Sequence, residues 1–226
     1  GELAIYRNIG NYNFELVNAE MGIEVIDRFS YIIPFDYNND GLTDFLAQTN
    51  YIMDKNHFIL FENNNGKFYK KNILQNVFLD ILNWTSADFN FDGRKDLFLS
   101  FANAKIGDKI LNNILLLNFK DKGFVFSYKN SPFLNTDNPI TISEYIDYNA
   151  DKKKDLITYS IDNIFKIWRN NEKFNFDETA EFTVSGLKYL TQIITADIDN
   201  DGDDDIILVL NDNIKIYKNR SNTYIK

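Results

Sequence analysis

Short apolar runs alternate with polar turns along the whole chain. Four of these runs, FLAQ, LFLSF, LITYS and IILVL, contain four or five residues each and are rich in strand-forming side chains, as buried β-strands are. A nine-residue polar loop precedes each run, and before that loop lies another extended segment, such as Ser30–Phe35 (SYIIPF) or Gln192–Ala196 (QIITA). The pattern predicts pairs of strands joined by polar hairpin loops.

A second pattern recurs between these hairpins. Alternating apolar residues lead to an aromatic residue and then a polar turn, which is typical of a strand with one face on a core. Four copies and one degenerate copy occur: LAIYRN (Leu3–Asn8), FILFEN (Phe58–Asn63), FKIWRN (Phe165–Asn170), IKIYKN (Ile214–Asn219) and ILLLNF (Ile114–Phe119). A turn and one more strand follow the motif, as in NNNGKFYKKN and NNEKFNFDET.

The two motifs combine into one repeat of four antiparallel strands. The polar loops begin at residues 36, 88, 147 and 197, so the repeat is 50 to 59 residues long. Four strands in about 50 residues indicate a β-propeller blade. We therefore expect an all-β fold in which residues 1–226 form a single partial β-propeller. The expected four-stranded antiparallel blades are approximately residues 28–76, 81–135, 140–184 and 189–226, with an N-terminal half-blade at residues 1–20.

The N-terminal half-blade is surplus to these four blades. The C-terminal repeat has its own third strand and, in Asn222–Lys226 (NTYIK), part of a fourth. In a closed propeller, strands from both termini often complete one blade and so remove exposed edges. Here the C-terminal blade is already nearly complete without the N-terminal strands. We expect the chain to be part of a larger propeller, for example a seven-bladed one, whose other blades lie upstream or on another chain. The opening GELAIY, without Met or a signal-like segment, fits a processed or excised piece.

The polar loops carry oxygen-bearing side chains at alternate positions. Asp or Asn at loop positions 1, 3, 5 and 9 suits a hard divalent cation, which takes six to eight oxygen ligands at about 2.3–2.6 Å. An EF-hand would need Glu at position 12 and flanking helices, whereas position 12 here is apolar or threonine and strands flank the loops. The sequence therefore predicts calcium loops in β-hairpins. They are DYNNDGLTD (Asp36–Asp44), DFNFDGRKD (Asp88–Asp96), DYNADKKKD (Asp147–Asp155) and DIDNDGDDD (Asp197–Asp205).

Composition narrows the choice of partners. The net charge of −9 argues against a nucleic-acid backbone or an anionic membrane as the binding partner. Much of this charge lies in the polar loops, and four bound Ca²⁺ would change it to about −1. The chain has no cysteine, so disulfide, thiolate and zinc–thiolate chemistry are excluded. No apolar run approaches the roughly 18 residues of a membrane-spanning helix.

With both motifs placed, the chain resembles the FG-GAP/VCBS repeat family, the calcium-loop propellers exemplified by integrin α-subunit heads. The D-x-[DN]-x-D-G-x-x-D-[LIF] loops and the aromatic-Asn turns carry the resemblance, which covers essentially the whole chain. Phe14–Ile23 (FELVNAEMGI) and Phe176–Phe182 (FDETAEF) also resemble the inter-blade segment of bacterial members with ASPIC-type domains. The resemblance implies a propeller of about seven blades, calcium in the hairpin loops and no chemistry in the repeats themselves.

By position, the resemblance implies five ligands per loop, four through side chains and one, at position 7, through the backbone carbonyl. Up to four Ca²⁺ are expected. Loop 3 has Lys152 where the others have glycine at position 6, and its lysines add positive charge, so we expect it to bind most weakly. Loop 4 has one more carboxylate than the others and should bind most tightly. The implied ligands are Asp36, Asn38, Asp40, Leu42 and Asp44 in loop 1; Asp88, Asn90, Asp92, Arg94 and Asp96 in loop 2; Asp147, Asn149, Asp151, Lys153 and Asp155 in loop 3; and Asp197, Asp199, Asp201, Asp203 and Asp205 in loop 4.

Other candidate residues favour structural roles. His57 is the only histidine and has no catalytic partners near it in the sequence. Trp168 takes the aromatic position of a repeated strand, and Trp84 precedes a calcium loop, so packing is preferred over sugar stacking for both. The pair Asp203 and Asp204 could perform acid–base chemistry, but ligation and solvation explain it better. We expect no catalytic residue, since no Ser-His-Asp set or histidine metal site is recognisable.

Three functions remain open at this point. The first is a non-enzymatic, calcium-stabilised propeller that binds another protein in adhesion or surface assembly. The second is a carbohydrate-binding, lectin-like propeller. The third is the scaffold of a polysaccharide-active enzyme, which would need charged residues in long loops such as Asn103–Asn113 (NAKIGDKILNN). Calcium loops of modest affinity work at the ~10⁻⁴–10⁻³ M calcium found outside cells, so we expect an extracytoplasmic location: secreted, periplasmic or cell-surface.

Overall fold

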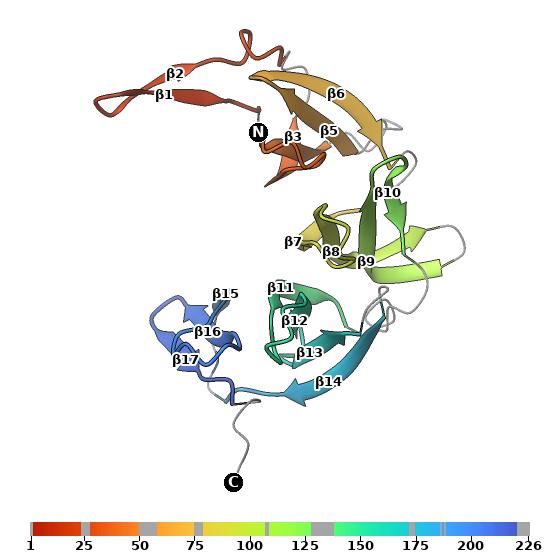
Figure 1. Cartoon of the computed structure of the whole chain (residues 1–226), viewed down its shortest axis with the longest axis vertical. Coiled ribbons are helices and arrows are strands. Elements are labelled where there is room, and N and C mark those ends of the chain that lie inside the picture. The colour runs from red at the N-terminus through yellow and green to blue at the C-terminus, as the bar shows by residue number, and fades with distance from the viewer. Residues whose placement is uncertain are drawn as a thin grey trace. The chain divides into compact units, whose positions relative to one another are not determined.

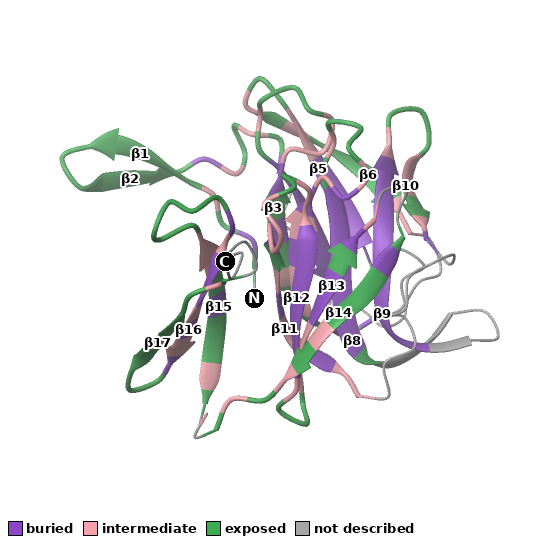
Figure 2. Ribbon diagram, turned by 60° about the horizontal axis from the view of Figure 1, so that its bottom comes forward, coloured by how far each residue is buried: buried purple, intermediate pink, exposed green. Residues whose placement is uncertain are grey.

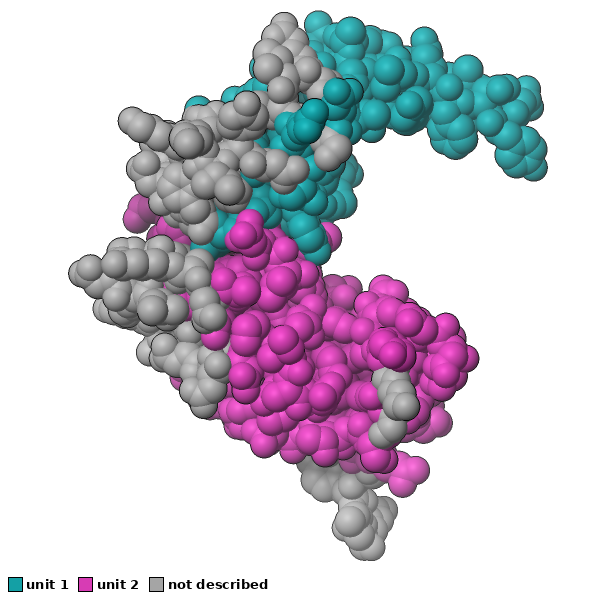
Figure 3. Space-filling model, turned by 180° about the vertical axis from the view of Figure 1, so that it is seen from behind, with its two compact units in different colours: residues 1–79 teal, residues 80–226 magenta. Residues whose placement is uncertain are grey.

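The structure, a computed structural model, describes residues 2–23, 28–49, 58–74, 79–106, 109–127, 138–171, 175–185, 187 and 189–220. These residues form strands and turns, and they belong to two compact units, residues 1–79 and 80–226 (Figures 1 and 3). No helix with the length and apolarity needed to cross a membrane occurs in this part of the chain. The all-β architecture expected from the alternating pattern is confirmed.

The first unit contains one hairpin and one four-stranded antiparallel sheet. Phe45 and Phe61 stack at 4.6 Å between ring centroids on adjacent strands of the sheet, and Phe29 meets Phe61 edge-on at 6.0 Å. These rings form the centre of the unit's apolar core. The hairpin is β1 (Tyr6–Gly10) and β2 (Asn13–Leu16), and the sheet, in spatial order, is β3 (Phe29–Phe35), β4 (Asp44–Thr49), β5 (Phe58–Asn64) and β6 (Lys67–Ile73).

The second unit contains three antiparallel sheets, each with its strands in chain order. The first two sheets have four strands, and the third has three among the described residues. Their strands are β7 (Ile81–Ala87), β8 (Asp96–Ile106), β9 (Lys109–Phe119) and β10 (Gly123–Phe126); β11 (Ile140–Ile146), β12 (Asp155–Ser160), β13 (Phe165–Asn170) and β14 (Phe176–Phe182); and β15 (Leu190–Ala196), β16 (Asp205–Leu210) and β17 (Ile214–Tyr217). This repeated meander confirms the predicted partial β-propeller.

The two central strands of the β11–β14 sheet, β12 and β13, are buried on both faces. Leu156 and Trp168 pack with side chains of the β7–β10 sheet, whereas Ile157, Phe165 and Ile167 pack with side chains of the β15–β17 sheet. Successive residues of a strand point to opposite faces, so a strand between two cores must be apolar at nearly every position. This explains the continuous apolar runs in the sequence, and Figure 2 shows β8, β12 and β13 as mainly buried.

The first strand of every sheet carries an irregularity at the same place. The ladder with the second strand shifts register between Phe29 and Tyr31 in β3, and at the equivalent residues of β7, β11 and β15. In two sheets the residue inside the shift is a threonine whose hydroxyl donates to a carbonyl of the second strand: Thr141 to Tyr159 at 3.2 Å and Thr191 to Val209 at 3.0 Å. A β-bulge increases local twist, and this one recurs near the start of the first strand in all four sheets.

One predicted element differs from the structure. The segment Asn103–Asn113, expected to be a long inter-blade loop, instead continues β8 and begins β9, and it pairs as far as Ile106 with Lys109. The mixed polar and apolar residues of this segment fit a strand as well as a loop, and the pairing of Ala104 with Leu111 and of Ile106 with Lys109 extends the hairpin. The predicted strand at Asn222–Lys226 lies outside the described residues.

Candidate calcium loops

The four predicted loops occupy the same place in each sheet, between its first and second strands. Loop 1 joins β3 to β4, loop 2 joins β7 to β8, loop 3 joins β11 to β12, and loop 4 joins β15 to β16. Each loop starts as the first strand ends, and its position 9 is the first residue of the second strand. Two hydrogen-bonded strands therefore fix both ends of every loop.

The position-1 carboxylate holds the turn of each loop together. In loop 1, Asp36 Oδ2 accepts the N–H of Gly41 at 2.9 Å, and Asp36 Oδ1 accepts that of Asp40 at 3.2 Å. Loops 2 and 4 repeat both hydrogen bonds with Asp88 and Asp197 as acceptors. Short polar side chains commonly bind backbone N–H groups of their own turn in this way. The chain therefore wraps around its first carboxylate.

The side chains at positions 3 and 5 converge. Asn38 Nδ2 donates to Asp40 Oδ2 at 2.8 Å, and loops 2 and 3 show the same contact at 3.0 and 3.1 Å. The position-5 carboxylate also accepts the N–H of position 7, as Asp40 does from Leu42 at 2.8 Å. In all four loops the position-7 N–H group thus donates to the position-5 carboxylate. Their predicted role as carbonyl ligands stays a prediction.

The position-9 carboxylate is buried in every loop. Asp44, Asp96, Asp155 and Asp205 each have 0% exposed surface. In loop 2, Asp96 Oδ2 accepts the N–H of Phe89 at 3.0 Å, and Asp96 Oδ1 accepts the N–H of Asn118 at 2.8 Å. The equivalent pair of bonds occurs in the other three loops. These two donors orient the carboxylate toward its loop and leave each oxygen a lone pair for a cation.

Burial makes several of the loop carboxylates costly to ionise without a cation. Burial raises the pKa of Asp96 to about 7 and that of Asp155 to about 6, although two backbone N–H donors oppose each rise and neighbouring loop carboxylates add to it. Burial likewise raises the pKa of Asp44 and of Asp147. A divalent cation among the oxygens would reverse this effect, because an opposite charge favours the ionised form.

The donor set fits calcium. Every side-chain ligand that the loops offer is an oxygen, which is the ligand type of Ca²⁺. Oxygens around one Ca²⁺ lie within about 5 Å of one another, and in loop 4 one oxygen each of Asp197, Asp199 and Asp205 lies within 4.8 Å of the other two. In loop 3, Asp147 Oδ1 is buried, and no donor among the described residues lies in bonding geometry with it. When bound, Ca²⁺ would supply positive charge to these oxygens.

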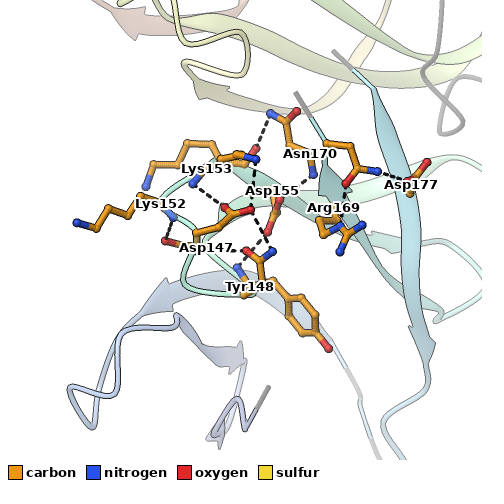
Figure 4. A network of polar contacts seen from close by, with 12 residues as sticks. Asp147, Tyr148, Lys152, Lys153, Asp155, Arg169, Asn170 and Asp177 are labelled. Carbon is orange, nitrogen blue, oxygen red and sulfur yellow. Dashed lines mark hydrogen bonds and ion pairs between the residues drawn. The ribbon is translucent and has the colours of Figure 1, made fainter. Parts of the chain in front are cut away.

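Loop 3 differs from the other three loops at position 6, where it has lysine in place of glycine, as the sequence indicates. Lys152 adopts φ +64° at position 6, where Gly41, Gly93 and Gly202 have φ between +84° and +98°. Its N–H still donates to Asp147 Oδ2 at 2.9 Å, so the turn is kept despite the strain of a side chain in the left-handed region (Figure 4). Lys153 Nζ lies 3.6 Å from Asp151 Oδ2. A lysine therefore stands beside one of the expected ligands.

The sequence interpretation missed two features of these loops. Position 4 is also left-handed in all four, at Asn39, Phe91, Ala150 and Asn200, with φ between +56° and +61°. Only the two asparagines signal this conformation in the sequence.

The second missed feature is the asparagine that ends the aromatic-Asn motif. Its N–H binds the position-9 carboxylate, and its Nδ2 donates to the carbonyl of position 8, as Asn170 does to Lys154 at 3.2 Å. Asn170 Nδ2 also reaches the Phe89 carbonyl in loop 2 at 2.8 Å. Asn63, Asn118 and Asn219 make the same contacts within their own loops. The recurrence of the motif was its signal, and the structure gives the physical reason.

The remaining candidates are placed as follows. Trp168 is 1% exposed and its Nε1 donates to Thr158 Oγ1 at 2.9 Å, so it packs in the core as expected. Trp84 is half-buried in β7. Asp203 is fully buried, and Asp204 Oδ2 accepts the N–H of Asp147 in loop 3. His57 lies outside the described residues.

A shallow cavity lies beside loop 2. Its volume is about 360 Å³, within the range of small-molecule sites. Arg94 from the loop, together with Phe119 and Lys120 at the β9–β10 turn, contributes to its lining. The other lining residues are Asp92, Asp121 and Lys122.

The sequence matches the FG-GAP-like repeat family over residues 36–99 and 147–208. These two regions cover more than half of the chain and contain all four loops. The chain therefore belongs to the FG-GAP-like repeat family, and its fold is a partial β-propeller. A comparison with curated proteins gave no match.

Several solved structures are similar in fold. A lectin from Agrocybe aegerita, described as recognising non-reducing terminal N-acetylglucosamine, aligns with a TM-score of 0.54 at 18% identity, over 96% of this chain and 60% of the lectin chain. The rhamnogalacturonan lyase of Bacillus licheniformis aligns with a TM-score of 0.48 at 13% identity, over 79% of this chain and 40% of the lyase. BBS1N in complex with ARL6DN aligns with a TM-score of 0.49 at 10% identity, over 98% and 74% of the two chains. This chain thus spans only part of the length of these proteins.

Proposed function

We propose that this protein is a calcium-stabilised β-propeller module that binds another protein, in adhesion or surface assembly outside the cytoplasm, and that it is not a catalyst. The observation that carries the calcium assignment is the buried position-9 aspartate, which recurs in all four loops with the same two backbone donors. A carboxylate that is ionised and buried among further carboxylates needs a compensating charge. The proposed role of calcium is structural: it fixes the hairpins on which each sheet is built.

The proposed partner is one or more further blades, from the same chain or another, together with a protein ligand on the completed propeller. In the β11–β14 sheet, Phe165 and Ile167 are 0% and 2% exposed because the β15–β17 sheet covers them. The equivalent side chains of the β15–β17 sheet, Ile214 and Ile216, are 64% and 57% exposed. An apolar face of this kind marks an interaction surface. A blade with the same inner face would cover it.

Calcium binding is tested by titration calorimetry and by thermal unfolding with calcium or with EDTA. One site filled at one hundred times its Kd adds about 2.7 kcal/mol, which in a chain of this size corresponds to about 5–11 °C in Tm. Asp92→Ala should remove the loop 2 site and lower the stoichiometry by one. Asp212→Ala, which changes the same charge in an exposed turn, should not. Equal unfolding temperatures in calcium and EDTA would contradict the proposal.

A second candidate function is carbohydrate binding, which the cavity beside loop 2 favours. Phe119 offers an apolar surface there, and Arg94 and Lys120 offer hydrogen-bond donors, as sugar sites require. The lectin with a similar fold supports this candidate. A glycan array read in calcium and in EDTA separates the two functions: a calcium-dependent signal that Phe119→Ala removes supports the lectin. Capture of a protein partner that Ile216→Lys abolishes, with a silent array, supports the protein-binding module.

A further inference from the structure

Loops 3 and 4 are joined directly by hydrogen bonds. Asp204, at position 8 of loop 4, donates its backbone N–H to the Asp147 carbonyl at 2.9 Å, and its Oδ2 accepts the Asp147 N–H at 2.7 Å. Asp147 is the first expected ligand of loop 3. One residue of loop 4 therefore binds both the N–H and the carbonyl of a calcium-ligand residue in the neighbouring blade.

Two further contacts connect these loops. Asn219 Nδ2 donates to the Tyr148 carbonyl of loop 3 at 2.7 Å and to the Asp204 carbonyl at 3.3 Å. A Cβ built on Gly202 would lie 3.8 Å from the Ala150 Cβ, so the turns of the two loops are within van der Waals reach. Asp204 itself stands between Asp203, which is fully buried, and the ligand Asp205. Its backbone is therefore continuous with that of the expected loop 4 ligands.

Asp204 is exceptional among the residues at position 8. Its counterparts are Thr43, Lys95 and Lys154, and the Lys154 ammonium lies 4.7 Å from the centroid of the Tyr145 ring. Loop 3 is also the loop that carries the strained Lys152 and the lysine beside Asp151. The carboxylate that the other pairs of loops lack thus occurs next to the loop with the weakest expected ligand set.

We propose that Asp204 is a positioning residue for the calcium site of loop 3, and that through it calcium binding at loops 3 and 4 is mutually dependent. This inference rests on the proposed calcium function. Asp204 binds both the N–H and the carbonyl of Asp147, so the Asp147 carboxylate is already oriented when the ion binds. The negative charge of Asp204 also offsets the positive charge of the loop 3 lysines. Calcium in loop 4 orders Asp205 and, with it, Asp204. Partners outside the first coordination shell commonly change metal affinity 10- to 100-fold.

Site-resolved calcium titrations by NMR test this proposal on the full chain. Protein labelled with ¹⁵N-lysine reports on loop 3 through Lys152 and Lys153, and protein labelled with ¹⁵N-glycine reports on the other loops through Gly41, Gly93 and Gly202. Asp204→Ala should raise the calcium midpoint of loop 3 about tenfold and leave loop 1 unchanged. Asp204→Asn keeps an acceptor for the Asp147 N–H and should recover most of the loss. Asp212→Ala, the same charge change at an exposed turn of the β15–β17 sheet, should shift neither loop.

The reciprocal variant tests the coupling. Asp151→Ala, which disables loop 3 at an exposed position, should raise the loop 4 midpoint about fivefold, since coupling between two sites acts equally in both directions. Unchanged loop 3 midpoints in Asp204→Ala, or a loop 4 midpoint indifferent to Asp151→Ala, would overturn the inference while leaving the calcium function intact. If calcium shifts the resonances of loops 1, 2 and 4 in the unmodified protein but not those of loop 3, the inference is likewise overturned and the calcium function stays intact. No shift at any loop would overturn the proposed function itself.

Discussion

Replacing Asn170 with alanine tests the role of the aromatic-Asn motif in joining blades. The side chain is fully buried, and its Nδ2 donates to the Phe89 carbonyl at 2.8 Å and to the Lys154 carbonyl at 3.2 Å. Alanine keeps the backbone N–H that binds Asp155 but removes both side-chain bonds. The Phe89 carbonyl then loses its buried donor.

The expected loss follows from these two bonds. A buried acceptor deprived of its donor costs about 1–3 kcal/mol, and the longer, half-buried bond to Lys154 adds about 0.5–1.5 kcal/mol. We expect Asn170→Ala to lower the free energy of unfolding by about 2–4 kcal/mol, or the urea midpoint by roughly 1 M for a slope near 2–3 kcal/mol/M.

The assay is urea unfolding followed by tryptophan fluorescence. Both tryptophans, Trp84 and Trp168, belong to the second unit, so the signal reports on the sheets that Asn170 connects. Asn171→Ala, whose side-chain hydrogen bonds are exposed, is the matched control and should change the free energy by less than about 1 kcal/mol. A loss below about 0.5 kcal/mol for Asn170→Ala, the size expected of an ordinary surface substitution, would refute the reasoning.

Three further predictions concern the loops. Calcium competes with protons at carboxylates of raised pKa. Calcium affinity should therefore fall as the pH drops below about 7 at loop 2, because of Asp96, and below about 6 at loop 3, because of Asp155. Calorimetry at pH 5.5, 6.5 and 8 that gives one constant affinity would contradict this. The pKa of Asp96 and of Asp155 is higher in the folded protein than the ordinary value of about 3.9 expected in the unfolded chain. Without calcium, protonation of these two carboxyls therefore stabilises the folded state fully below about pH 3.9, and this stabilisation is lost as the pH rises through about 7. Unfolding in EDTA should therefore show stability falling between pH 5 and 8, and a rise would rule this out. Gly202→Ala should lower the free energy of unfolding by about 1–2 kcal/mol because of the φ of +98° alone, since the added Cβ meets only the Ala150 Cβ at 3.8 Å. Lys152→Gly should instead stabilise loop 3 and tighten its calcium binding. Thermal unfolding that ranks the two variants in the opposite order would show that the loops do not adopt this turn.

The repeat and its strands could be predicted from the sequence because local patterns encode them. The apolar runs after each loop are continuous where a sheet lies between two cores, as at Leu156 and Ile157, and this periodicity is visible without a structure. The prediction of a loop at Asn103–Asn113 was wrong because its mix of polar and apolar residues fits either state. Pairing of one arm with the other decides it, and pairing is not a local property.

The expected ligand positions were likewise readable from their spacing, whereas the contacts that support them were not. Asn170 and Phe89 are 81 residues apart, and Asp147 and Asp204 are 57 apart. Only the stacking of one sheet on the next brings them together. The sequence showed an asparagine recurring after an aromatic residue, but its role in binding the position-9 aspartate depends on the register of the third strand with the second.

Calcium occupancy of each hairpin loop is tested most directly by a crystal structure from crystals grown in millimolar calcium, with anomalous differences collected at a long wavelength. We expect an anomalous peak in each loop, strongest in loop 4 and weakest in loop 3, with oxygen ligands at about 2.3–2.6 Å from positions 1, 3, 5, 7 and 9. Well-ordered loops with no anomalous peak, and with water among the carboxylates, would contradict a calcium-stabilised propeller.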